Sequence, residues 1–496
     1  MLEQLAHALR QGADRPAVLG ASRTGATRVL ARCGELTELA DGYASALHQR
    51  YGLRPGDTIG VAVRPGPRAL AVMLAAHRLG LAIAVLDPAA GPDVLLARLS
   101  SARPALVLAD AAAQAVAGWA HPLARRAGLA LPPLAALGPV VTVGPRAPGC
   151  APALRPARAP LPAPYEGDGD AVIVFTSGTT SSPRAVVHSR GGLAAGMRTV
   201  TDLVRPRPGE TVLGGTSFVL VPSLAAGAAV ALPARSTRLL QRQIRLLRPA
   251  NTYLTPPQLR GLDGFTGRVW TGSAPASAEL LGRVKRAGAR EAWSVYALTE
   301  LFPAAAVEEA DKAAHQGDGD LLGQPLPGVG ARLSPEGELL LTGPAARHRY
   351  LGERPDPWVR TGDRARLTPD GRIVLAGRCK DMVLRRAENI YPGLYEPALH
   401  LPGVELAVLV GVPAEEGDER LVALIQPQAG ADRRQLRTAL QAPLGRMGSA
   451  RPDALLFAEI PLSGRSRKPD RAAASRLCAR ALEADGSRPS GTRGGR

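Results

Sequence analysis

The residues best suited to chemistry stand in one loop. An apolar segment, Val172–Phe175, leads into Thr176-Ser-Gly-Thr-Thr-Ser-Ser-Pro-Arg184. Small residues let the backbone approach a phosphate closely, and N–H groups and hydroxyls donate to its oxygens. Arg184 adds a cation that can bind two oxygens at once. The segment predicts a phosphate site, against the alternative of an ordinary polar turn; the G-x-x-x-x-G-K-[ST] motif of P-loop NTPases does not occur in this sequence.

Further chemical groups follow the loop in a fixed order. They lie in the segments Thr271–Pro275, Val295–Glu300, Arg360–Asp363, Gly377–Pro392 and Pro461–Arg471. A carboxylate such as Glu300 is a hard oxygen ligand suited to Mg²⁺. The carboxylate of Asp363 offers two acceptor oxygens to a pair of hydroxyls. The segments around Glu300 and Asp363 are weak signals alone and gain weight from their order, whereas Gly377–Pro392 is a specific signal by itself.

Together these segments resemble the AMP-binding adenylate-forming superfamily, which includes acyl-CoA synthetases, peptide-synthetase adenylation domains and firefly luciferase. The family loop reads T-S-G-[ST]-T-G-x-P-K-G, and the matching residues here are Thr176, Ser177, Gly178, Thr179, Thr180 and Pro183. The departures from it are Ser181, Arg184 and Ala185. The resemblance covers almost the whole chain, from about Pro16 to about Leu477, and is weakest over Asp93–Ala171.

The resemblance implies a role for each matched residue. Tyr296 would stack on adenine, Thr299 would contact the α-phosphate, and Asp363 would accept the ribose hydroxyls. Mg²⁺ would be held by Glu300 and Thr176. ATP would be bound by Thr176, Ser177, Gly178, Thr179, Thr180, Ser273, Ala274, Pro275, Tyr296, Ala297, Thr299, Asp363, Arg378 and Lys380, and the catalytic groups would be Lys468, Glu300, Thr176 and Arg184.

The C-terminal catalytic cation depends on the alignment of one segment. Pro461–Arg471 resembles the family's P-x-T-x-x-G-K-x-x-R, in which the lysine bridges the reacting carboxylate and phosphate. With one inserted residue, Lys468 and Arg471 keep the spacing; without it, Arg467 takes the lysine position. We favour Lys468, because a compact ammonium suits charge that builds up during attack.

Alternating patterns predict an α/β protein. Thr37–Tyr51 and Arg68–Leu79 have helical spacing, and Ile59–Val63 and Ala82–Leu86 are typical of strands, which favours a mostly parallel sheet covered by helices. Leu131–Pro164 is a proline-rich linker or an irregular surface segment. Antiparallel strands are expected at Leu339–Thr342 and Arg372–Ala376. Further strands are expected at Leu406–Val412 and Leu421–Gln426, with a helix at Arg433–Leu440.

The domain organisation follows from the resemblance and the length of 496 residues, which exceeds a single core. Residues 1–377 would form a large AMP-binding domain of layered α/β sheets. Residues 378–484 would form a small mobile α+β domain that rotates about Lys380. Residues 485–496 would be a disordered tail.

The implied reaction is ATP-dependent activation of a carboxylic acid to an acyl-adenylate, followed by transfer to coenzyme A. Arg386 and Ala387 replace residues near the thiol acceptor in the family. They favour a rival that loads a carrier protein or closes a hydroxy acid to a lactone. The lost glycines favour a second rival, a non-catalytic nucleotide-binding homologue. The apolar segment Thr216–Val221 favours an apolar or aromatic acid.

Composition and residue patterns argue against several other classes of protein. The net charge is +18, but the 57 arginines are scattered and form no long run, so a nucleic-acid partner is disfavoured and the charge favours anions such as ATP. The four cysteines form no C-x-x-C pair, and the N-terminus lacks the apolar core of a signal peptide. Ala69–Leu86 and Phe218–Leu232 are too short or interrupted to span a bilayer. A cytoplasmic location is expected.

Overall fold

The computed structural model describes residues 2–86, 102–126, 131–175, 185–385, 388–414, 419–463 and 467–486. One sheet holds the parallel strands of the first part of the chain. Its strands in spatial order are β18 (Arg349–Tyr350), β8 (Ala185–Ser189), β7 (Asp170–Phe175), β4 (Ala82–Val85), β3 (Thr58–Ala62), β5 (Leu106–Ala109) and β6 (Val140–Thr142). Strands β7, β4, β3, β5 and β6 run parallel, and β8 and β18 are added antiparallel at one edge.

A second, larger sheet joins a parallel half to an antiparallel half. The parallel half is β1 (Pro16–Ala21), β10 (Ala229–Ala231), β9 (Thr211–Leu213), β11 (Asn251–Tyr253), β12 (Arg268–Gly272) and β13 (Glu291–Tyr296), with β2 (Thr27–Arg32) antiparallel at its edge. The antiparallel half is β14 (Ala305–Glu308), β15 (Asp320–Pro325), β20 (Ile373–Arg378), β19 (Val359–Leu367), β17 (Glu338–Thr342) and β16 (Gly330–Leu333). The strands expected at Leu339–Thr342 and Arg372–Ala376 are therefore present and antiparallel to β19.

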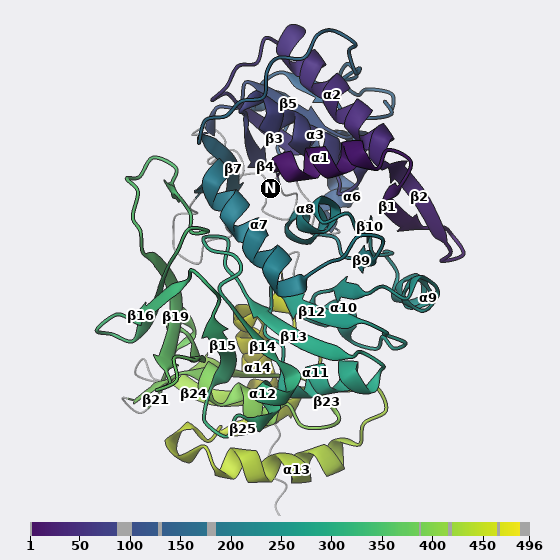
Figure 1. Ribbon diagram of the computed structural model, residues 1–496. Helices are drawn as coiled ribbons and strands as arrows, with labels where there is room; N and C mark the ends of the chain where they lie inside the picture. Colours follow the sequence, from purple (N-terminus) through teal and green to yellow (C-terminus); the bar gives the residue numbers. More distant parts are fainter. Residues whose placement is uncertain are drawn as a thin grey trace, which may run out of the picture.

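Helices cover both sheets (Figure 1). They are α1 (Leu2–Gln11), α2 (Cys33–Gln49), α3 (Pro67–Leu79), α5 (Ala111–Ala117), α6 (His121–Arg126), α7 (Arg190–Val204), α8 (Ser217–Ala225), α9 (Thr237–Leu247), α10 (Pro256–Leu259), α11 (Ala278–Arg286), α12 (Glu309–Ala314), α13 (Arg433–Gly445) and α14 (Arg471–Gly486). Serine side chains cap several of them: Ser236 accepts a hydrogen bond from the N–H of Leu239 at the start of α9, and Ser277 does so for Leu280 at α11.

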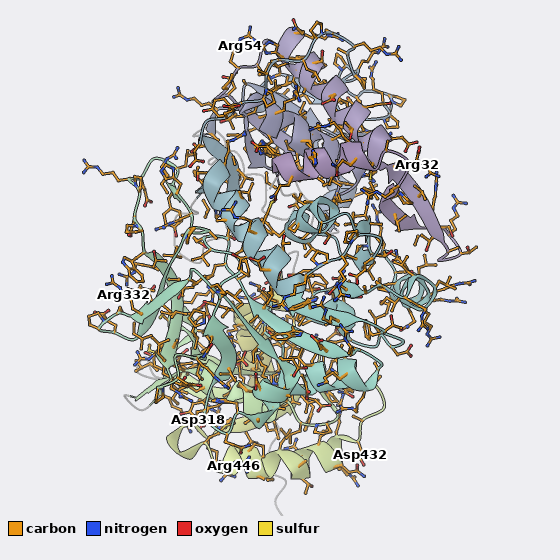
Figure 2. All side chains as sticks on the ribbon, viewed as in Figure 1. Arg32, Arg54, Asp318, Arg332, Asp432 and Arg446 are labelled. Atoms are coloured by element: carbon orange, nitrogen blue, oxygen red, sulfur yellow. The ribbon has the colours of Figure 1, made fainter. Side chains whose placement is uncertain are left out.

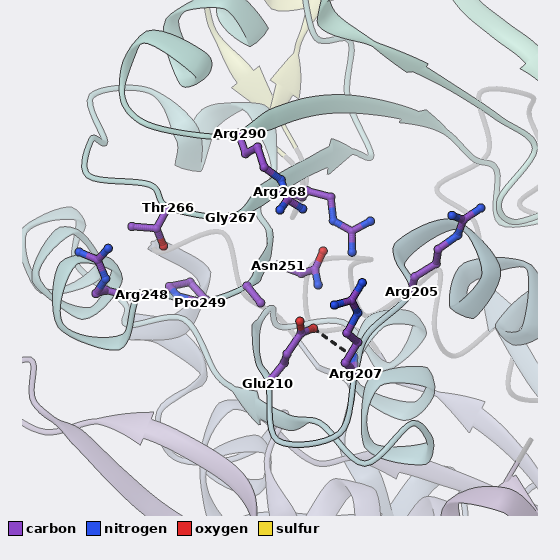
Figure 3. Close-up of a pocket in the computed structure, with 11 residues that line it drawn as sticks. Arg205, Arg207, Glu210, Arg248, Pro249, Asn251, Thr266, Gly267, Arg268 and Arg290 are labelled. Atoms are coloured by element: carbon purple, nitrogen blue, oxygen red, sulfur yellow. Dashed lines mark hydrogen bonds between the residues drawn. The ribbon is translucent and has the colours of Figure 1, made fainter.

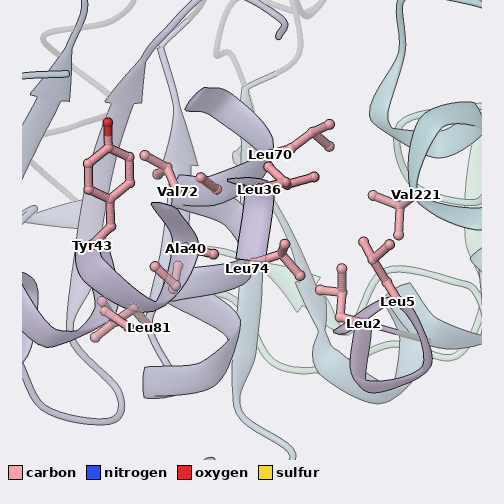
Figure 4. Close-up of a cluster of buried hydrophobic side chains, with 14 of the residues drawn as sticks. Leu2, Leu5, Leu36, Ala40, Tyr43, Leu70, Val72, Leu74, Leu81 and Val221 are labelled. Carbon is pink, nitrogen blue, oxygen red and sulfur yellow. The ribbon is translucent and has the colours of Figure 1, made fainter. Parts of the chain in front are cut away.

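The main core is aliphatic, in keeping with an aromatic content of only 3% in the sequence. Leu5 of α1 lies with Leu36 and Ala40 of α2, Leu70 of α3 and Val221 of α8 (Figure 4). These positions recur three or four residues apart along α2, which gives that helix its buried face. Burying such side chains contributes about 1.5–3 kcal/mol each. The apolar segment Phe218–Leu232 is thus a buried helix and strand, α8 and β10.

Beyond β20, which ends at Arg378, the chain forms a separate, smaller sheet with its own helices, called the smaller unit here; the predicted domain boundary at 377 remains a prediction. Its sheet contains β23 (Val404–Pro413), β24 (Glu419–Pro427) and β25 (Ala454–Phe457), covered by α13 and α14. Short hairpins pair β21 (Val383–Arg385) with β22 (Glu388–Ile390) and β26 (Leu462–Ser463) with β27 (Lys468–Pro469). Helix α14 runs to Gly486, and the rest of the expected tail lies outside the described residues. The mobility of this unit remains a prediction.

The surface carries its charge all round. Charged side chains such as Arg54, Arg332 and Arg446 extend outward on different sides of the molecule (Figure 2). No helix in the described ranges is long and apolar enough to cross a membrane. The proline-rich segment Leu131–Pro164 contains the strand β6 and a short 3₁₀ turn at Leu134–Ala136, and its other described residues lack regular structure.

Candidate active site

A buried carboxylate lies at the centre of the candidate site. Asp363 of β19 is 2 % exposed. Its Oδ2 accepts a hydrogen bond from the Tyr296 hydroxyl at 2.5 Å, and its Oδ1 lies 2.7 Å from Nε of Arg378. Burial raises the pKa of Asp363 above its ordinary value, against the lowering effect of the Arg378 charge. The carboxylate is therefore held by one neutral donor and one cation.

The strand arrangement brings these three residues together. β13 ends at Tyr296 and β20 ends at Arg378, and Arg378 is the direct partner of Asp363 in the antiparallel ladder. The Thr361 hydroxyl donates to the carbonyl of Leu339 at 2.8 Å and accepts from the N–H of Asp363 at 3.0 Å. Burial raises the pKa of Tyr296 well above its ordinary value, and the charge of Asp363 adds to this, so the phenol stays protonated and donates.

Lys468 approaches the same carboxylate from the smaller unit. It pairs with Ser463 in the β26–β27 hairpin. Although part of its side chain is accessible to solvent, partial burial of the ammonium is the main cause that lowers the pKa of Lys468. The positive charges of Arg378 and Lys380 lower it further, and Asp363 opposes them. Three cations therefore share the surroundings of Asp363.

Arg467, the alternative candidate for the catalytic cation, interacts with other residues than Lys468 does. It has a left-handed backbone conformation, with φ at +48°. Its positive charge acts on Arg260, which belongs to the larger unit, and lowers the pKa of that residue. Arg467 precedes strand β27, which begins at Lys468, so the two side chains leave the chain from different backbone conformations. This placement favours Lys468 as the cation of the site.

Arg471 braces the lysine hairpin. Its guanidinium binds both carboxylate oxygens of Glu396 at 2.7 Å, and its Nε lies 3.0 Å from Oδ2 of Asp381. It also donates to the carbonyl of Leu409 at 2.8 Å. The two carboxylates raise the pKa of Arg471. Arg471 is thus an internal anchor for the start of α14, beside the 3₁₀ turn Cys379–Asp381 that contains Lys380.

The expected adenine segments lie at the carboxyl ends of neighbouring parallel strands. Gly272 of β12 is paired with Val295 of β13, so Ser273 and Tyr296 follow side by side. Ser273 has φ at +68°, and its Oγ lies 3.3 Å from the Tyr253 hydroxyl. Ala274 is half-buried, and Pro275 and Ala297 are exposed. These residues form an accessible edge next to Asp363.

Glu300 is half-buried and has one side-chain partner in the described structure. Its Oε1 accepts from the Tyr350 hydroxyl at 3.2 Å, and its carbonyl accepts from the N–H of Arg347. One carboxylate fits Mg²⁺ only as one ligand among phosphate oxygens and water, which is how this ion is commonly held. Glu300 therefore fits the ion in that limited role.

His188 is a residue that the sequence did not single out. It is 1 % exposed, and its Nε2 lies 2.7 Å from the carbonyl oxygen of Thr299. Burial lowers the pKa of His188, so the ring is neutral and Nε2 carries the proton. The residue ties β8 to the segment that carries Thr299 and Glu300. A single histidine without a spacing partner gives no sequence signal for this role.

The phosphate loop itself is not among the described residues. Thr176, Ser177, Gly178, Thr179, Thr180 and Arg184 all fall within 176–184. The strands on either side are described: Phe175 of β7 pairs with Ala185 of β8. Arg349 of β18 clamps this hairpin through two 2.7 Å contacts with Asp170. Arg386 and Ala387 also lie outside the described residues.

An aromatic contact lies near the expected acid segment. Phe218, in the first turn of α8, lies 3.8 Å from Phe302 between ring centroids, with the rings tilted by 36°. His188 meets the same Phe302 ring edge-on at 5.9 Å. Burial also raises the pKa of Tyr253, which faces Ser273. Phe302 thus links Phe218 of α8 to His188 of β8.

Comparison with known proteins agrees with this architecture. The profile of the AMP-binding enzyme family matches residues 5–351, so the chain belongs to this family of adenylate-forming enzymes. Indoleacetate–CoA ligase of Aromatoleum aromaticum is 29% identical over 297 residues, which is 52% of this chain and 58% of that protein. Fatty acid–[acyl-carrier-protein] ligase ScoC of Streptomyces coeruleorubidus is 30% identical over 314 residues, 54% of this chain and 60% of that protein.

The chain therefore spans less than two thirds of these two curated relatives. Among solved structures, the amide bond synthetase McbA of Marinactinospora thermotolerans superposes with a TM-score of 0.77. It is 23% identical, and the match covers 96% of this chain and 100% of McbA. This likeness confirms the predicted α/β fold with its layered sheets.

Proposed function

We propose that this protein activates a carboxylic acid with ATP to form an acyl-adenylate and pyrophosphate. One observation carries the proposal: Tyr296, Asp363, Arg378 and Lys468 converge from four different strands, although they are widely separated in the sequence. An acceptor carboxylate flanked by cations is suited to a ribose and its neighbouring phosphate. Convergence from two units of the chain supports a site built for one ligand.

In this reaction a carboxylate oxygen of the acid bonds to the α-phosphorus, and the bond from that phosphorus to the pyrophosphate oxygen breaks. The side chains need no covalent chemistry. Asp363 would hold the ribose, Tyr296 the adenine, and Lys468 would neutralise charge that builds between carboxylate and phosphate. Thr176, Ser177, Gly178, Thr179, Thr180 and Arg184 would bind the phosphates. Thr176 and Glu300 would hold Mg²⁺, which withdraws charge from the phosphate oxygens when bound.

The acid we propose is apolar or aromatic. The tilted pair Phe218 and Phe302 supplies apolar surface at the start of α8, and the half-buried ring of Tyr253 lies beside Ser273. An α-amino acid would need a buried acid to pair its ammonium, and Thr216–Val221 supplies none. The similar indoleacetate–CoA ligase is named for an aromatic acid. This supports an aromatic substrate here.

For the second step we propose coenzyme A as the acceptor, in the cytoplasm. The alternative is a carrier protein or lactone closure, and the similarity to a fatty acid–[acyl-carrier-protein] ligase keeps it open. Incubation with ATP, coenzyme A and acid, followed by mass spectrometry, separates the two. Adenylate and pyrophosphate without acyl-CoA would remove the coenzyme A step and leave the first step intact.

The decisive test of the first step is ATP–pyrophosphate exchange over a panel of aromatic, aliphatic and amino acids. We expect exchange with apolar and aromatic acids above an acid-free control. If ATP binds but no acid supports exchange, the protein is a non-catalytic nucleotide-binding homologue.

A further inference from the structure

Five arginines surround a cavity on the side of the large sheet away from the candidate active site. The cavity has a volume of about 410 Å³ and is lined by Arg205, Arg207, Arg248, Arg268 and Arg290, with Asn251 at its centre (Figure 3). Ligand pockets commonly have volumes of about 300–1,000 Å³. These arginines come from four separate segments of the sequence, so no run of basic residues marks the cavity.

The cavity lies at the amino ends of the parallel strands. Asn251 begins β11 and Arg268 begins β12, and the two residues are direct partners in the ladder. Arg290 immediately precedes β13. Arg205 and Arg248 follow the ends of α7 and α9 in left-handed conformations. Tyr296 and Ser273 lie at the opposite, carboxyl ends of β13 and β12, so the two sites are distinct.

The positive charge of the cavity is poorly compensated by the protein. The one carboxylate among the lining residues, Glu210, accepts from the backbone N–H of Arg207 at 3.1 Å. Arg290 has a single long contact of 3.5 Å with Glu291. Within the described ranges, the guanidinium groups of Arg207 and Arg248 make no hydrogen bond or ion pair. The five guanidinium groups therefore have two nearby carboxylates, Glu210 and Glu291, which neutralise their charge only in part.

Buried polar groups of the cavity also lack partners. Asn251 is 1 % exposed; its Oδ1 accepts from the Trp270 indole at 3.1 Å, while its Nδ2 has no partner in the described structure. Its side chain points into the space between the guanidinium groups of Arg268 and Arg207 (Figure 3). Nε of Arg268 is likewise buried and unpaired, and Nη2 of the same residue donates to the carbonyl of Val204.

The charges crowd one another. Burial lowers the pKa of Arg268; the charges of Glu291 and Glu210 oppose this, and those of Arg290 and Arg205 add to it. A cation after a helix C-terminus stabilises the helix, which accounts for Arg205 and Arg248 without any ligand. It does not account for the unpaired donor of Asn251, because an unsatisfied buried amide costs free energy. A bound anion would neutralise the crowded positive charges and would also accept a hydrogen bond from Nδ2 of Asn251.

We propose that this arginine cavity binds a small, multiply charged phosphate anion. Guanidinium groups match phosphate oxygens in pairs, and the free N–H of Asn251 adds a neutral donor at the centre. The site is independent of the proposed acid activation. The phosphates could belong to an inorganic polyphosphate or to a nucleotide, and both present the same chemistry to these groups.

The test is calorimetric titration of the full chain with tripolyphosphate and, separately, with ADP, both without metal. The first variant is Asn251→Asp, which keeps the acceptor for Trp270 and replaces the free donor by a negative charge. The second is Arg207→Ser/Arg248→Ser, which removes the two unpaired guanidinium groups. Its matched control is Arg28→Ser/Arg433→Ser, which loses the same charge from exposed positions elsewhere.

We expect each cavity variant to lose at least tenfold in affinity for tripolyphosphate, while the control changes less than about twofold. Bound anion should also raise the unfolding temperature of the wild type more than that of the cavity variants. A cavity-dependent gain of ADP over tripolyphosphate would identify a nucleotide, and equal binding would identify the phosphates alone. Equal affinities in wild type and cavity variants, or an equal loss in the control, would overturn the proposal. The difference between variants isolates the cavity even if the anion also binds near Thr176–Pro183.

Discussion

Strands β12 and β13 end in opposite electrostatic environments. At their carboxyl ends, Tyr296 donates to the buried carboxylate of Asp363, and Arg378 and Lys468 lie around that carboxylate. At their amino ends, Arg268 and Arg290 face other arginines, and the nearby Glu210 is bonded to a backbone N–H. The same two strands thus carry an acceptor among cations at one end and cations with little acceptor at the other.

The two ends differ in whether the buried charge is neutralised by the protein itself or is left for a bound ion to neutralise. At Asp363 the protein compensates its own buried carboxylate, so the site is already shaped when a ligand arrives. At the arginine cavity the compensation is left incomplete, so binding of an anion should change stability more than shape. The predictions below test this contrast, beginning with the largest expected effect.

Replacing Lys468 by alanine should lower ATP–pyrophosphate exchange by about 10²–10³-fold, as is typical for loss of one group that stabilises developing charge. ATP affinity should change little, because the loop and Asp363 remain. Arg467→Ala is the matched control, since it removes a neighbouring cation whose field acts on Arg260. A large loss in Arg467→Ala with normal exchange in Lys468→Ala would show that the other alignment is correct.

Asp363→Asn should weaken ATP binding at least tenfold, since one of the two acceptor oxygens becomes a donor. The stability of the folded protein, unlike its ATP affinity, should not fall in this variant. The pKa of Asp363 is raised in the folded state, so its contribution to stability is present at acid pH and is lost as pH rises through the raised pKa. The variant, which cannot ionise, should therefore unfold at a temperature no lower than wild type at pH 7.

Both quantities can be read from calorimetry, with the exposed substitution Asp311→Asn as control. Unchanged ATP affinity in Asp363→Asn would contradict the assignment of the ribose position.

Glu405→Gln should lower exchange several-fold. Glu405 of β23 lies 2.9 Å from Arg260 and 3.3 Å from Arg283, and all three side chains are largely buried. These two arginines belong to the larger unit, so their contact with Glu405 docks the smaller unit that carries Lys468. Loss of the charge leaves two neighbouring cations uncompensated. The unfolding temperature should fall with the rate while ATP affinity is kept; unchanged exchange would show that docking does not depend on this contact.

Exchange should also decline on the alkaline side as Lys468 loses its proton, at a pH below the ordinary range for lysine, because its pKa is lowered. The charge of Lys380 contributes to that lowering. Lys380→Gln should therefore move the alkaline limb of the pH–rate profile to higher pH, whatever its effect on the maximal rate. If the alkaline limb does not move, the charge of Lys380 does not influence the ionisation of Lys468.

The smallest effect should come from the other end of the strands. Arg207→Ser/Arg248→Ser should leave exchange within about twofold of wild type in buffers free of phosphate anions, since neither side chain lies near Asp363. A large loss would mean that the two ends are energetically coupled through β12 and β13.

The pairing of Asp363 with Arg378 has a local origin in the sequence. The turn Pro369-Asp-Gly371 connects two strands whose short loop fixes their register, and that register places Arg378 opposite Asp363. Motifs that are local, or that belong to one hairpin, can be predicted from the residues alone.

Contacts between distant segments leave no such pattern. His188 supports Thr299, 111 residues further along the chain, and Glu405 reaches Arg260 and Arg283 of another unit. Arg205 and Arg248 look like ordinary cations at helix ends until the sheet brings them beside Asn251. These features depend on packing between elements, and local residue patterns carry no information about it.

The scarcity of lysine gives the site a practical handle. Of four lysines, Lys285 is paired with Glu308 and Glu309, and the side chain of Lys312 is 4% exposed against Asp320. Lys380 and Lys468 are the pair whose pKa values are lowered, which increases the uncharged, nucleophilic fraction of each amine. An amine-reactive probe at mildly alkaline pH should thus label side chains chiefly beside Asp363. Peptide mass mapping would then report, without any engineered tag, whether the proposed nucleotide site around Asp363 is occupied.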